Sequence, residues 1–323
     1  MSINKILSVC ALAFVALGAF FFLTKNTPAE KAFRVSICKA IEHEALNSVE
    51  KGIRDYLSKC KDVTFDAYTC QGNQVTAAQI ASKVANDSAP ILVTIGTLPT
   101  LASFQLAKNS KLSLIFSSVT NPGDITSSFN GTNTTGVSNF VSLQPQIALF
   151  KGIQPNLKRL GIIYNSGESN SVAIVEKLRP ILMEMGITLV EQSIQKSSDI
   201  PQAVNYIVKN VDAVFVSNDN TVLAGLAFVV KTCTANKIPV YVSDTDQVEK
   251  GCLASLGPNQ YDIGVQTGKI VEMIKNGADI NSIDVTYPVK TELFINLDAA
   301  AALGLTIPDD VLSRADKIIW GTP

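Results

Sequence analysis

The chain has 323 residues, with 27 basic and 28 acidic side chains and a formal net charge of −1 at pH 7. Because the charge is nearly balanced and no Lys- or Arg-rich run occurs, a nucleic-acid partner is not expected. Apolar residues make up 46% of the chain, which is typical of a globular fold and argues against disorder.

The chain begins with an uninterrupted apolar segment, residues 6–23, behind a single Lys5. Such a run is about the minimum that crosses a bilayer as a helix, and it is slightly longer than the apolar core of a usual secretory signal. Both interpretations predict export of the remaining residues to the periplasm or cell envelope. Thr27 and Ala29 favour cleavage before Glu30, so we expect residues 1–29 to be a signal peptide. An uncleaved anchor formed by residues 6–23 is the alternative.

Short β-rich runs then alternate with helical patterns, which predicts parallel sheets covered by helices. In the first half, strands are expected at residues 33–38, 63–68, 91–95 and 114–116, and helices at 45–58, 75–86 and 98–108. A turn-rich stretch, 130–135, precedes a short extended segment at 136–140.

The same alternation begins again after this stretch. Strands are expected at residues 160–164, 188–192, 213–217, 240–243 and 253–256, with helices at 168–185, 199–209 and 221–235. The tail adds helices at 263–276 and 299–303, an extended stretch at 286–290 and a strand at 293–296, and it closes with residues 317–320. The pattern predicts an α/β protein with two similar units in tandem, both completed by the tail.

Cysteines and histidine give little support for a metal site or a cofactor. The only histidine is His43, and none of the cysteines after residue 30 has CxxC spacing, so we expect no metal. Cys38 and Cys70 end neighbouring predicted strands, and they are better placed for a disulfide than Cys60 and Cys70, which a strand would hold roughly 30 Å apart. Buried free thiols are the simpler interpretation for these and for Cys233 and Cys252.

The sequence also lacks the common motifs of enzymes. It contains no GxGxxG after a strand, no GxxxxGK[ST] and no GxSxG, so neither a nucleotide cofactor nor a hydrolase elbow is predicted. A Ser-His-Asp triad would have to use His43. We therefore expect no catalytic residues, and an exported enzyme is the least supported of the possible functions.

Polar side chains follow several predicted strands. Since ligands bind beyond the carboxyl ends of strands in open parallel sheets, the expected site is a cleft between the two units. Thr97 opens a helix, where free N–H groups can hold a carboxylate. The runs Asp219-Asn220-Thr221 and Asp244-Thr245-Asp246 place carboxylates at sheet ends, and these suit a ligand ammonium. Helix capping is the alternative role for Thr97 and for the aspartates of both runs. Together these residues predict a zwitterion held between the units.

Several stretches, in this order and spacing, resemble the periplasmic substrate-binding proteins of ABC importers, in particular the tryptophan/tyrosine-type family with the type I periplasmic-binding fold. They are EHEAL (42–46), QGNQVTAAQIA (71–81), FSSVTNPGD (116–124), GTNTTGVSN (131–139), PNLKRLGIIYNSGESNSV (155–172), VDAVFVSNDNTV (211–222), IPVYVSDTDQVEKGCLASLG (238–257) and GLTIPDDVLSRADKII (304–319).

The resemblance implies two Rossmann-like lobes joined by crossovers near residues 139–142, 258–262 and 287–291. Lobe 1 would comprise residues 30–140 plus 261–289, and lobe 2 residues 141–260 plus 290–323. It also implies that a monomer captures a small molecule by lobe closure, performs no chemistry on it, and delivers it to an ABC permease. An amino acid is expected, with an aromatic one favoured. A membrane-anchored sensor ectodomain of the same fold is the alternative.

Site residues are carried over from the family to the matching positions. Those expected to face the ligand carboxylate are Thr97, Thr120 and Asn121. Those expected to face the ammonium are Asp219, Asn220 and Asp246, with Asn165 and Ser166 as rim contacts. His43 lies where the family often has a histidine. Tyr164 and Phe140 could line the cleft, although core packing explains both equally well.

Overall fold

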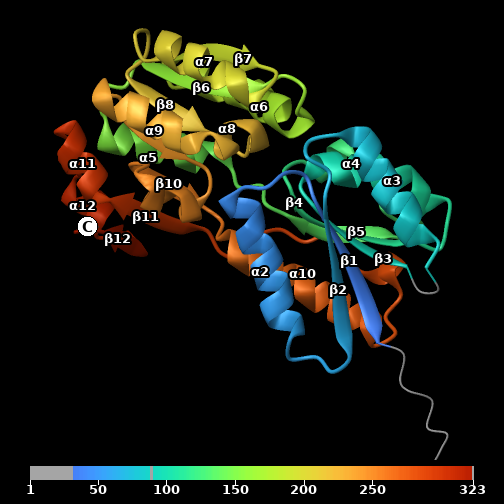
Figure 1. Ribbon diagram of the computed structural model, residues 1–323. Helices are drawn as coiled ribbons and strands as arrows, with labels where there is room; N and C mark the ends of the chain where they lie inside the picture. Colours follow the sequence, from blue (N-terminus) through green and yellow to red (C-terminus); the bar gives the residue numbers. More distant parts are fainter. Residues whose placement is uncertain (1–31, 88–89, 322–323) are drawn as a thin grey trace, which may run out of the picture.

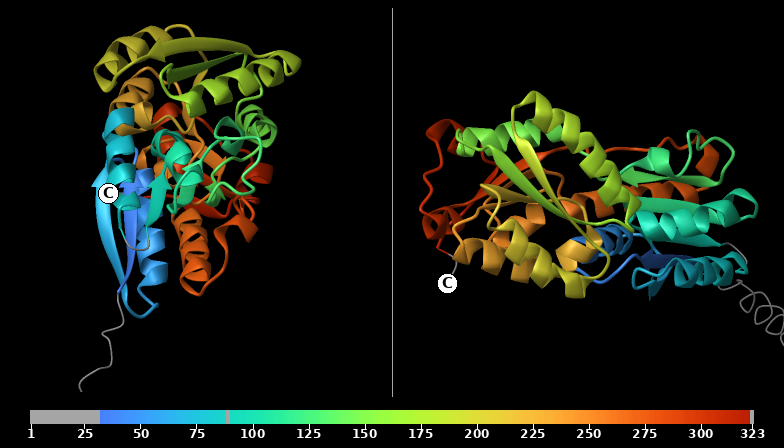
Figure 2. Two further views of the ribbon diagram at one scale, coloured as in Figure 1. Left: turned by 90° about the vertical axis from the view of Figure 1, so that its right-hand side faces the viewer. Right: turned by 90° about the horizontal axis from the view of Figure 1, so that it is seen from above.

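The computed structural model describes residues 32–87 and 90–321. It consists of two lobes that lie next to one another, each a sheet with helices on both faces (Figure 1). We call the unit built on the five-stranded sheet lobe 1 and the unit built on the seven-stranded sheet lobe 2. The two further views show the same separation into two layered units (Figure 2).

Lobe 1 is a parallel sheet with the strand order β2-β1-β3-β4-β5. Its strands are β1 (Phe33–Lys39), β2 (Val63–Thr69), β3 (Ile91–Ile95), β4 (Ser113–Val119) and β5 (Thr134–Ser138). One face packs against α2 (Glu44–Leu57) and α10 (Gln260–Lys275), and the other against α3 (Gln74–Ala85) and α4 (Thr97–Lys108). Two short 3₁₀ turns, Pro122–Asp124 and Ile280–Ser282, and a bridge between Val137 and Thr286 complete the lobe.

Lobe 2 has the strand order β12-β11-β10-β9-β8-β6-β7 and is parallel except between β10 and β11. Its strands are β6 (Arg159–Asn165), β7 (Thr188–Ile194), β8 (Ala213–Val216), β9 (Val240–Val242), β10 (Ala254–Gly257), β11 (Glu292–Asn296) and β12 (Lys317–Ile319). Its helices are α5 (Leu143–Ile153), α6 (Ser169–Glu184), α7 (Ile200–Ile207), α8 (Asn220–Ala224), α9 (Leu226–Ala235), α11 (Leu297–Leu303) and α12 (Asp309–Leu312), with 3₁₀ turns at Ser197–Asp199 and Thr245–Lys250.

The central strands, such as β3 and β8, are buried on both faces, as expected for sheets covered by helices on each side. In β1, Val35 and Ile37 pack in the cluster with α2 and α10, whereas Cys38 packs in the cluster with α3 and α4. In β4, Ile115 packs in the cluster with α2 and α10, and Phe116 packs in the cluster with α3 and α4. The period of two along each strand therefore assigns alternate residues to two separate cores within lobe 1.

Glycines allow α2 and α10 to pack closely, although α10 comes from the distant end of the chain. A Cβ atom added at Gly264 would lie 2.1 Å from the carbonyl oxygen of Val49, and one added at Gly52 would lie 2.1 Å from that of Tyr261. The hydroxyl of Thr267 also lies 2.7 Å from that of Ser117 on β4. This packing fixes the first residue of α10, Gln260, at the junction of the two lobes.

The predicted α/β class with mostly parallel sheets is confirmed. The predicted helix 221–235 is wrong as a single element, because the chain breaks at Gly225 into α8 and α9. Two helices, α5 and α12, have no predicted counterpart. The chain passes between the lobes at residues 139–142, 258–259 and 287–291.

The five described cysteines are free thiols, and Cys38, Cys70, Cys233 and Cys252 are buried. The simpler interpretation is therefore confirmed for these four, and Cys38 is not bonded to Cys70. None of the helices within the described residues is both long and apolar enough to cross a membrane. The apolar segment 6–23 lies outside the described residues.

Candidate functional site

Two adjoining cavities lie between the lobes, beyond the carboxyl ends of several strands. The inner cavity is narrow, with only about 10 Å³ in which the centre of a water molecule fits. It is lined by His43, Ala45, Leu46, Gly96, Thr97, Ser118, Thr120, Asn139, Asn170, Asn218, Asn220, Leu223, Asp244 and Gln260. The outer cavity offers about 450 Å³ and is lined by Ala40, Ile41, Gly72, Leu98, Asn165, Ser166, Gly167, Glu168, Gln195, Asn220 and Thr221. Asn220 is common to both.

The N-terminus of α4 forms part of the lobe 1 wall. Gly96 follows β3 with φ +98°, and a Cβ atom there would also lie 3.1 Å from that of Ala40. Only glycine adopts this turn without strain. Thr97 is the first residue of the helix, and its hydroxyl has no hydrogen-bond partner in the protein. Because the first N–H groups of a helix also lack backbone partners, this wall suits an anionic group.

An irregularity in β4 directs Ser118 into the inner cavity. The register between β4 and β5 shifts between Ser117 and Val119, and Ser118 has φ +55°. Its hydroxyl donates to Oε1 of Gln260 at 2.7 Å. Bulges of this kind re-aim side chains near functional sites, and a non-glycine residue in the left-handed region carries strain.

Four buried polar atoms on the lobe 1 side of the inner cavity have no partner in the protein. They are His43 Nδ1, Thr97 Oγ1, Thr120 Oγ1 and Asn139 Oδ1. A buried polar atom without a partner costs about 1–3 kcal/mol, and natural proteins contain few of them. Their convergence on one cavity indicates a binding site for a polar ligand.

The lobe 2 wall contributes a buried acid. Oδ1 of Asp244 accepts hydrogen bonds from Nδ2 of Asn218 at 2.8 Å and from Nε2 of Gln260 at 2.6 Å. Burial raises the pKa of Asp244 to about 7, although both hydrogen bonds favour the charged form. No lysine or arginine is among the described residues that line either cavity. An ammonium group would thus supply the charge partner that Asp244 lacks.

Gln260 joins the two walls, since it accepts from Ser118 of lobe 1 and donates to Asp244 of lobe 2. Its position follows from the packing of α10 on α2, because it is the first residue of α10. The inner cavity is therefore closed at its base by a chain of hydrogen bonds that connects the lobes.

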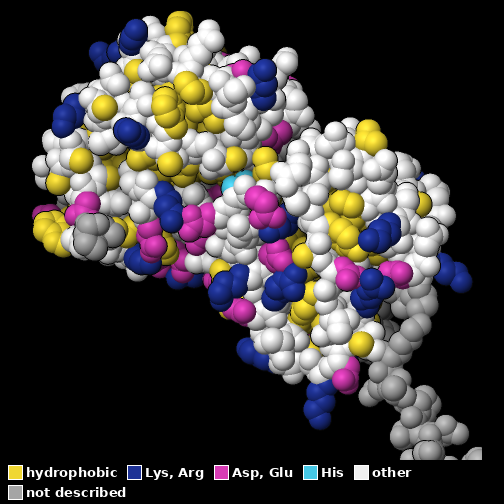
Figure 3. Space-filling model, in the orientation of Figure 1, with side chains coloured by type: hydrophobic (Ala, Val, Ile, Leu, Met, Phe, Trp, Pro, Cys, Tyr) yellow, Lys and Arg dark blue, Asp and Glu magenta, His cyan; other side chains and the backbone are white. Residues whose placement is uncertain are grey.

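A second set of hydrogen bonds connects the two lobes through Asn220. The carboxylate of Glu168 accepts four hydrogen bonds from the N-terminus of α8: from the backbone N–H groups of Asn220 and Thr221 at 3.0 Å each, from Asn220 Nδ2 at 2.6 Å and from Thr221 Oγ1 at 2.7 Å. Oδ1 of Asn220 in turn lies 3.1 Å from Nε2 of His43 in lobe 1. In the space-filling view, the histidine lies at the junction of the lobes (Figure 3).

His43 is 9% exposed. Burial lowers its pKa below the ordinary value, against the effects of the hydrogen bond to Asn220 and of nearby carboxylates. The ring is therefore neutral at pH 7, and one of its nitrogens is an acceptor.

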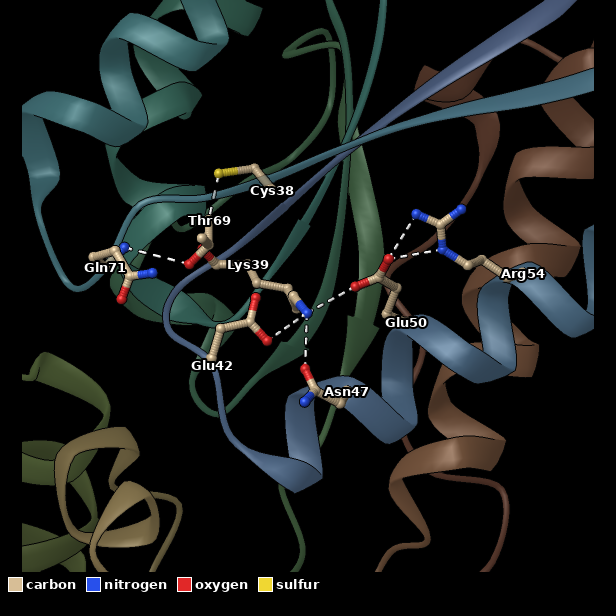
Figure 4. A network of polar contacts seen from close by, with 8 residues as sticks. All are labelled: Cys38, Lys39, Glu42, Asn47, Glu50, Arg54, Thr69 and Gln71. Carbon is tan, nitrogen blue, oxygen red and sulfur yellow. Dashed lines mark hydrogen bonds and ion pairs between the residues drawn. The ribbon is translucent and has the colours of Figure 1, made fainter.

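A buried lysine holds the loop that carries His43. The ammonium group of Lys39, at the end of β1, lies 2.9 Å from Glu42, 2.9 Å from Glu50 and 2.7 Å from Oδ1 of Asn47, and Arg54 binds Glu50 in turn (Figure 4). Burial opposes the charge, but the hydrogen bonds to Glu42 and Glu50 keep the pKa of Lys39 above its ordinary value. The segment between β1 and α2 is thus fixed at both ends.

The predicted site residues divide into four groups. His43, Thr97 and Thr120 line the inner cavity, Asn165 and Ser166 line the outer cavity, and Asn220 lines both. Asn121, Asp219 and Asp246 do not line either cavity. The amide of Asn121 instead donates to Asp124 at 2.6 Å.

Asp219 and Asp246 have structural partners. Asp219 is fully buried and caps α8, because Oδ1 accepts from the N–H of Val222 at 2.8 Å and Oδ2 from that of Asn165 at 2.6 Å. Burial and the charge of Glu168 raise its pKa to about 7. Asp246 accepts from the N–H of Gln260 at 3.3 Å, and burial raises its pKa to about 6.

Tyr164 and Phe140, the two aromatic residues considered for the cleft, line neither cavity. The hydroxyl of Tyr164 donates to Glu191 at 3.3 Å, and the ring of Phe140 lies 4.4 Å from the ammonium group of Lys177. Sequence reasoning did not select Ser118, Asn139, Glu168, Asn170, Asn218, Asp244 and Gln260, which do line the cavities. For Asp244 the signal was present, because it belongs to the same SDTD run (243–246) as Asp246.

Comparisons with known proteins place this geometry in context. A family model described as ABC transporter substrate binding protein matches residues 34–319. A tyrosine-binding protein of Clostridioides difficile is 29% identical over 290 residues, which are 87% of this chain and 84% of that protein. The crystal structure of a conserved domain protein from Vibrio cholerae is 35% identical, covers 89% of this chain and 100% of its own, and has a TM-score of 0.83.

Two further solved structures differ in whether a ligand is bound. The ABC domain from Streptococcus pneumoniae in complex with L-Trp is 29% identical, covers 90% of this chain and 100% of its own, and has a TM-score of 0.83. A ligand-free, open structure of a substrate binding protein from Clostridium difficile has the same identity and the same coverage of both chains, but a TM-score of 0.66. The lobes of the present structure are thus arranged more like those of the ligand complex. The chain belongs to the family of ABC transporter substrate-binding proteins and has the type I periplasmic-binding fold.

Proposed function

We propose that the protein binds a free amino acid between its lobes, as the solute-binding component of an ABC importer, and delivers it to a membrane permease. The observation that carries this proposal is the asymmetry of the inner cavity. Lobe 1 contributes the unpartnered hydroxyl groups of Thr97, at a helix N-terminus, and Thr120, whereas lobe 2 contributes the buried carboxylate of Asp244 without a cation. A zwitterion satisfies both walls at once.

In this arrangement Thr97, Thr120 and the N-terminus of α4 hold the ligand carboxylate, and Asp244 holds the ammonium. The ligand side chain extends toward the outer cavity, where Ala40, Ile41 and Leu98 provide apolar surface. Because the inner cavity has almost no free space in this arrangement, the lobes open to admit the ligand and close upon it. We place the hinges in residues 139–142, 258–259 and 287–291, which separate the predicted segments 30–140 plus 261–289 and 141–260 plus 290–323.

An aromatic amino acid is the ligand we propose first. The outer cavity, at about 450 Å³, has room for a large side chain. The relatives named above bind tyrosine or L-Trp according to their descriptions. We further propose that the protein is exported, acts as a monomer and leaves its ligand chemically unchanged.

The first test is a thermal-shift and calorimetric titration of the purified protein with L-tryptophan and L-tyrosine. At a thousandfold excess over the dissociation constant, binding to the native state adds about 4 kcal/mol to the free energy of unfolding. Indole-3-propionate, which lacks the ammonium of tryptophan, and tryptophan methyl ester, which lacks the carboxylate, should both fail to stabilise the protein. A panel of other amino acids, sugars and nucleosides follows in the same assay.

Asp244→Asn should weaken binding of the amino acid by about tenfold to a hundredfold, because the ammonium loses a charged partner. Asp246→Asn is the matched control, since Asp246 belongs to the same loop but lies outside the cavity, and it should leave affinity within about threefold. Stabilisation by a sugar or nucleoside alone would refute the zwitterion assignment. Equal loss in both variants would refute the role of Asp244.

A further inference from the structure

Three side chains form a line of hydrogen bonds. It runs from Glu168 of lobe 2, beside the outer cavity, through Asn220 to His43 of lobe 1, beside the inner cavity. Glu168 accepts from Asn220 Nδ2 at 2.6 Å, and Asn220 Oδ1 lies 3.1 Å from His43 Nε2. His43 Nδ1, the other ring nitrogen, is buried and has no partner in the protein. The proposed function uses none of these contacts.

The direction of each bond in this line follows from Glu168. An ionised carboxylate only accepts hydrogen bonds, so the amide group of Asn220 must turn its NH₂ side toward Glu168. The backbone N–H groups of Asn220 and Thr221 donate to the same carboxylate and keep it in place. Turning the amide over would bring Oδ1 of Asn220 against a carboxylate oxygen, which is repulsive.

The orientation of Asn220 then decides the state of the histidine. Since Oδ1 faces His43 and can only accept, Nε2 must carry the proton of the neutral ring. Nδ1 is consequently a bare acceptor. It belongs to a side chain that lines the inner cavity, where it has no partner in the protein.

We propose that Glu168 acts as a positioning residue that, through Asn220, locks His43 in the Nε2–H tautomer and so makes Nδ1 an acceptor for an N–H or O–H donor of the ligand. A ligand that places only acceptor oxygens beside Nδ1 is thereby disfavoured. This inference takes the inner cavity as the ligand site, as proposed above, but its test reads the tautomer of His43 separately from ligand affinity. The line also crosses from one lobe to the other, so the tautomer is fixed only when the lobes are together.

The chain contains one histidine, which allows a direct test. We would record two-dimensional ¹H–¹⁵N spectra of the ¹⁵N-labelled full-length protein at pH 7.5, without ligand and with saturating L-tryptophan. Neutral histidine in water is a mixture of tautomers, so its two nitrogens give averaged shifts, whereas a locked ring gives one pyrrole-type and one pyridine-type nitrogen. In the saturated protein we expect the locked pattern with the proton on Nε2. We also expect the Nδ1 resonance to move on binding, as a nitrogen does when it accepts a hydrogen bond.

Two variants test the relay. Asn220→Ala removes the acceptor opposite Nε2, and Glu168→Gln replaces one acceptor oxygen by an NH₂ group, so that Asn220 can turn over. Both should give averaged shifts, and Glu168→Gln should weaken L-tryptophan binding by about tenfold or more. Ser166→Ala, in the same loop and also beside the outer cavity, is the control and should retain the locked pattern. Thermal unfolding establishes that each variant is folded.

The outcomes separate the two proposals. If Glu168→Gln lowers the melting temperature but His43 keeps the locked Nε2–H pattern, Glu168 has only a structural role and the relay is refuted. A proton on Nδ1 in the unmodified protein refutes it directly. A locked tautomer without any response to L-tryptophan or L-tyrosine upholds the relay and counts against the aromatic ligand instead. Ligand binding that leaves the Nδ1 resonance unmoved refutes the donor contact.

Discussion

Nε2 of His43 in lobe 1 lies 3.1 Å from Oδ1 of Asn220 in lobe 2, at a point where both side chains line the inner cavity. The contact is largely shielded from water, as the histidine is 9% exposed. Closure of the lobes and completion of the ligand site therefore depend on the same pair of residues. In the energetic description of such proteins, the ligand shifts the equilibrium by binding the closed form more tightly.

A second contact between the lobes, the ion pair of Lys250 and Glu44, should contribute far less to ligand binding than the contact of His43 with Asn220. Lys250 Nζ lies 3.0 Å from Glu44 Oε2, but these side chains are 47% and 54% exposed. Exposed ion pairs contribute about 0.2–1 kcal/mol and are screened by salt. Lys250→Ala should therefore weaken ligand binding by less than about fivefold, and by less still at high salt. Calorimetric titration at two ionic strengths measures this, and a loss as large as that of Asn220→Ala would contradict it.

Asp219 should be important for stability and not for ligand contact. Its carboxylate accepts the backbone N–H of Val222, in the first turn of α8, and that of Asn165, which ends β6. Asp219→Ala leaves both N–H groups without their partner, so we expect the free energy of unfolding to fall by about 1–3 kcal/mol. Asp219→Asn keeps an acceptor oxygen and should lose less. Urea unfolding measures both, and equal stability of Asp219→Ala and the unmodified protein would refute this role.

Most strands and helices were predicted from the sequence because apolar residues recur in this chain with the period of 2 that is typical of strands or the period of 3.6 that is typical of helices. The strand at 91–95 was predicted with the bounds that β3 has. The helix α5 was missed although Leu143, Ile147 and Phe150 have helical spacing, because Pro145 argues for a turn in a sequence taken alone. In the structure Pro145 lies in the first turn of α5, where a missing N–H costs little.

The candidate site was predicted only in part, for a different reason. Thr97 was identified because it opens a helix just beyond a strand end, where ligands bind in open sheets, whereas Thr120 and Asn220 were carried over from the family resemblance; all three line the inner cavity. Gln260 could not be found this way, as its place depends on the packing of α10 against α2 from more than 200 residues earlier. The family resemblance favoured Asp246, whereas in the structure Asp244 lines the inner cavity and Asp246 lies in the 3₁₀ turn that follows β9.

The three buried acids should make the stability of the ligand-free protein depend on pH. Burial raises the pKa to about 7 for Asp219 and Asp244, and to about 6 for Asp246, above the unfolded value of about 3.9. At a pH between the unfolded and the folded pKa values, the folded state therefore binds more protons than the unfolded state. The free energy of unfolding consequently increases as the pH falls from 8 to 6. His43 opposes this, since burial lowers its pKa and the unfolded chain takes up that proton.

With three acids against one histidine, we expect a net gain of roughly 1 kcal/mol per pH unit over this range. Urea unfolding at pH 6, 7 and 8 measures it. Asp244→Asn should flatten the dependence, whereas Lys250→Ala should leave it unchanged. Ligand affinity should have the opposite trend, because protonation of Asp244 removes the charge that holds an ammonium. Stability that decreases steadily from pH 8 to 6 would show that the acids do not titrate in this way.

The packing of α2 against α10 gives a prediction that needs no ligand. Gly264→Ala would place a Cβ atom 2.1 Å from the carbonyl oxygen of Val49, which cannot move without displacing the helix. Overpacking of this kind costs about 1–3 kcal/mol, and the shift of α10 would also move Gln260. Gly152→Ala in α5 is the control, because its nearest neighbour is a methyl group of Val311 at 3.8 Å. It should stabilise the protein by up to about 1 kcal/mol through helix propensity. Urea unfolding measures the change in the free energy of unfolding for both variants. An equal change in the two would refute the close contact between α2 and α10.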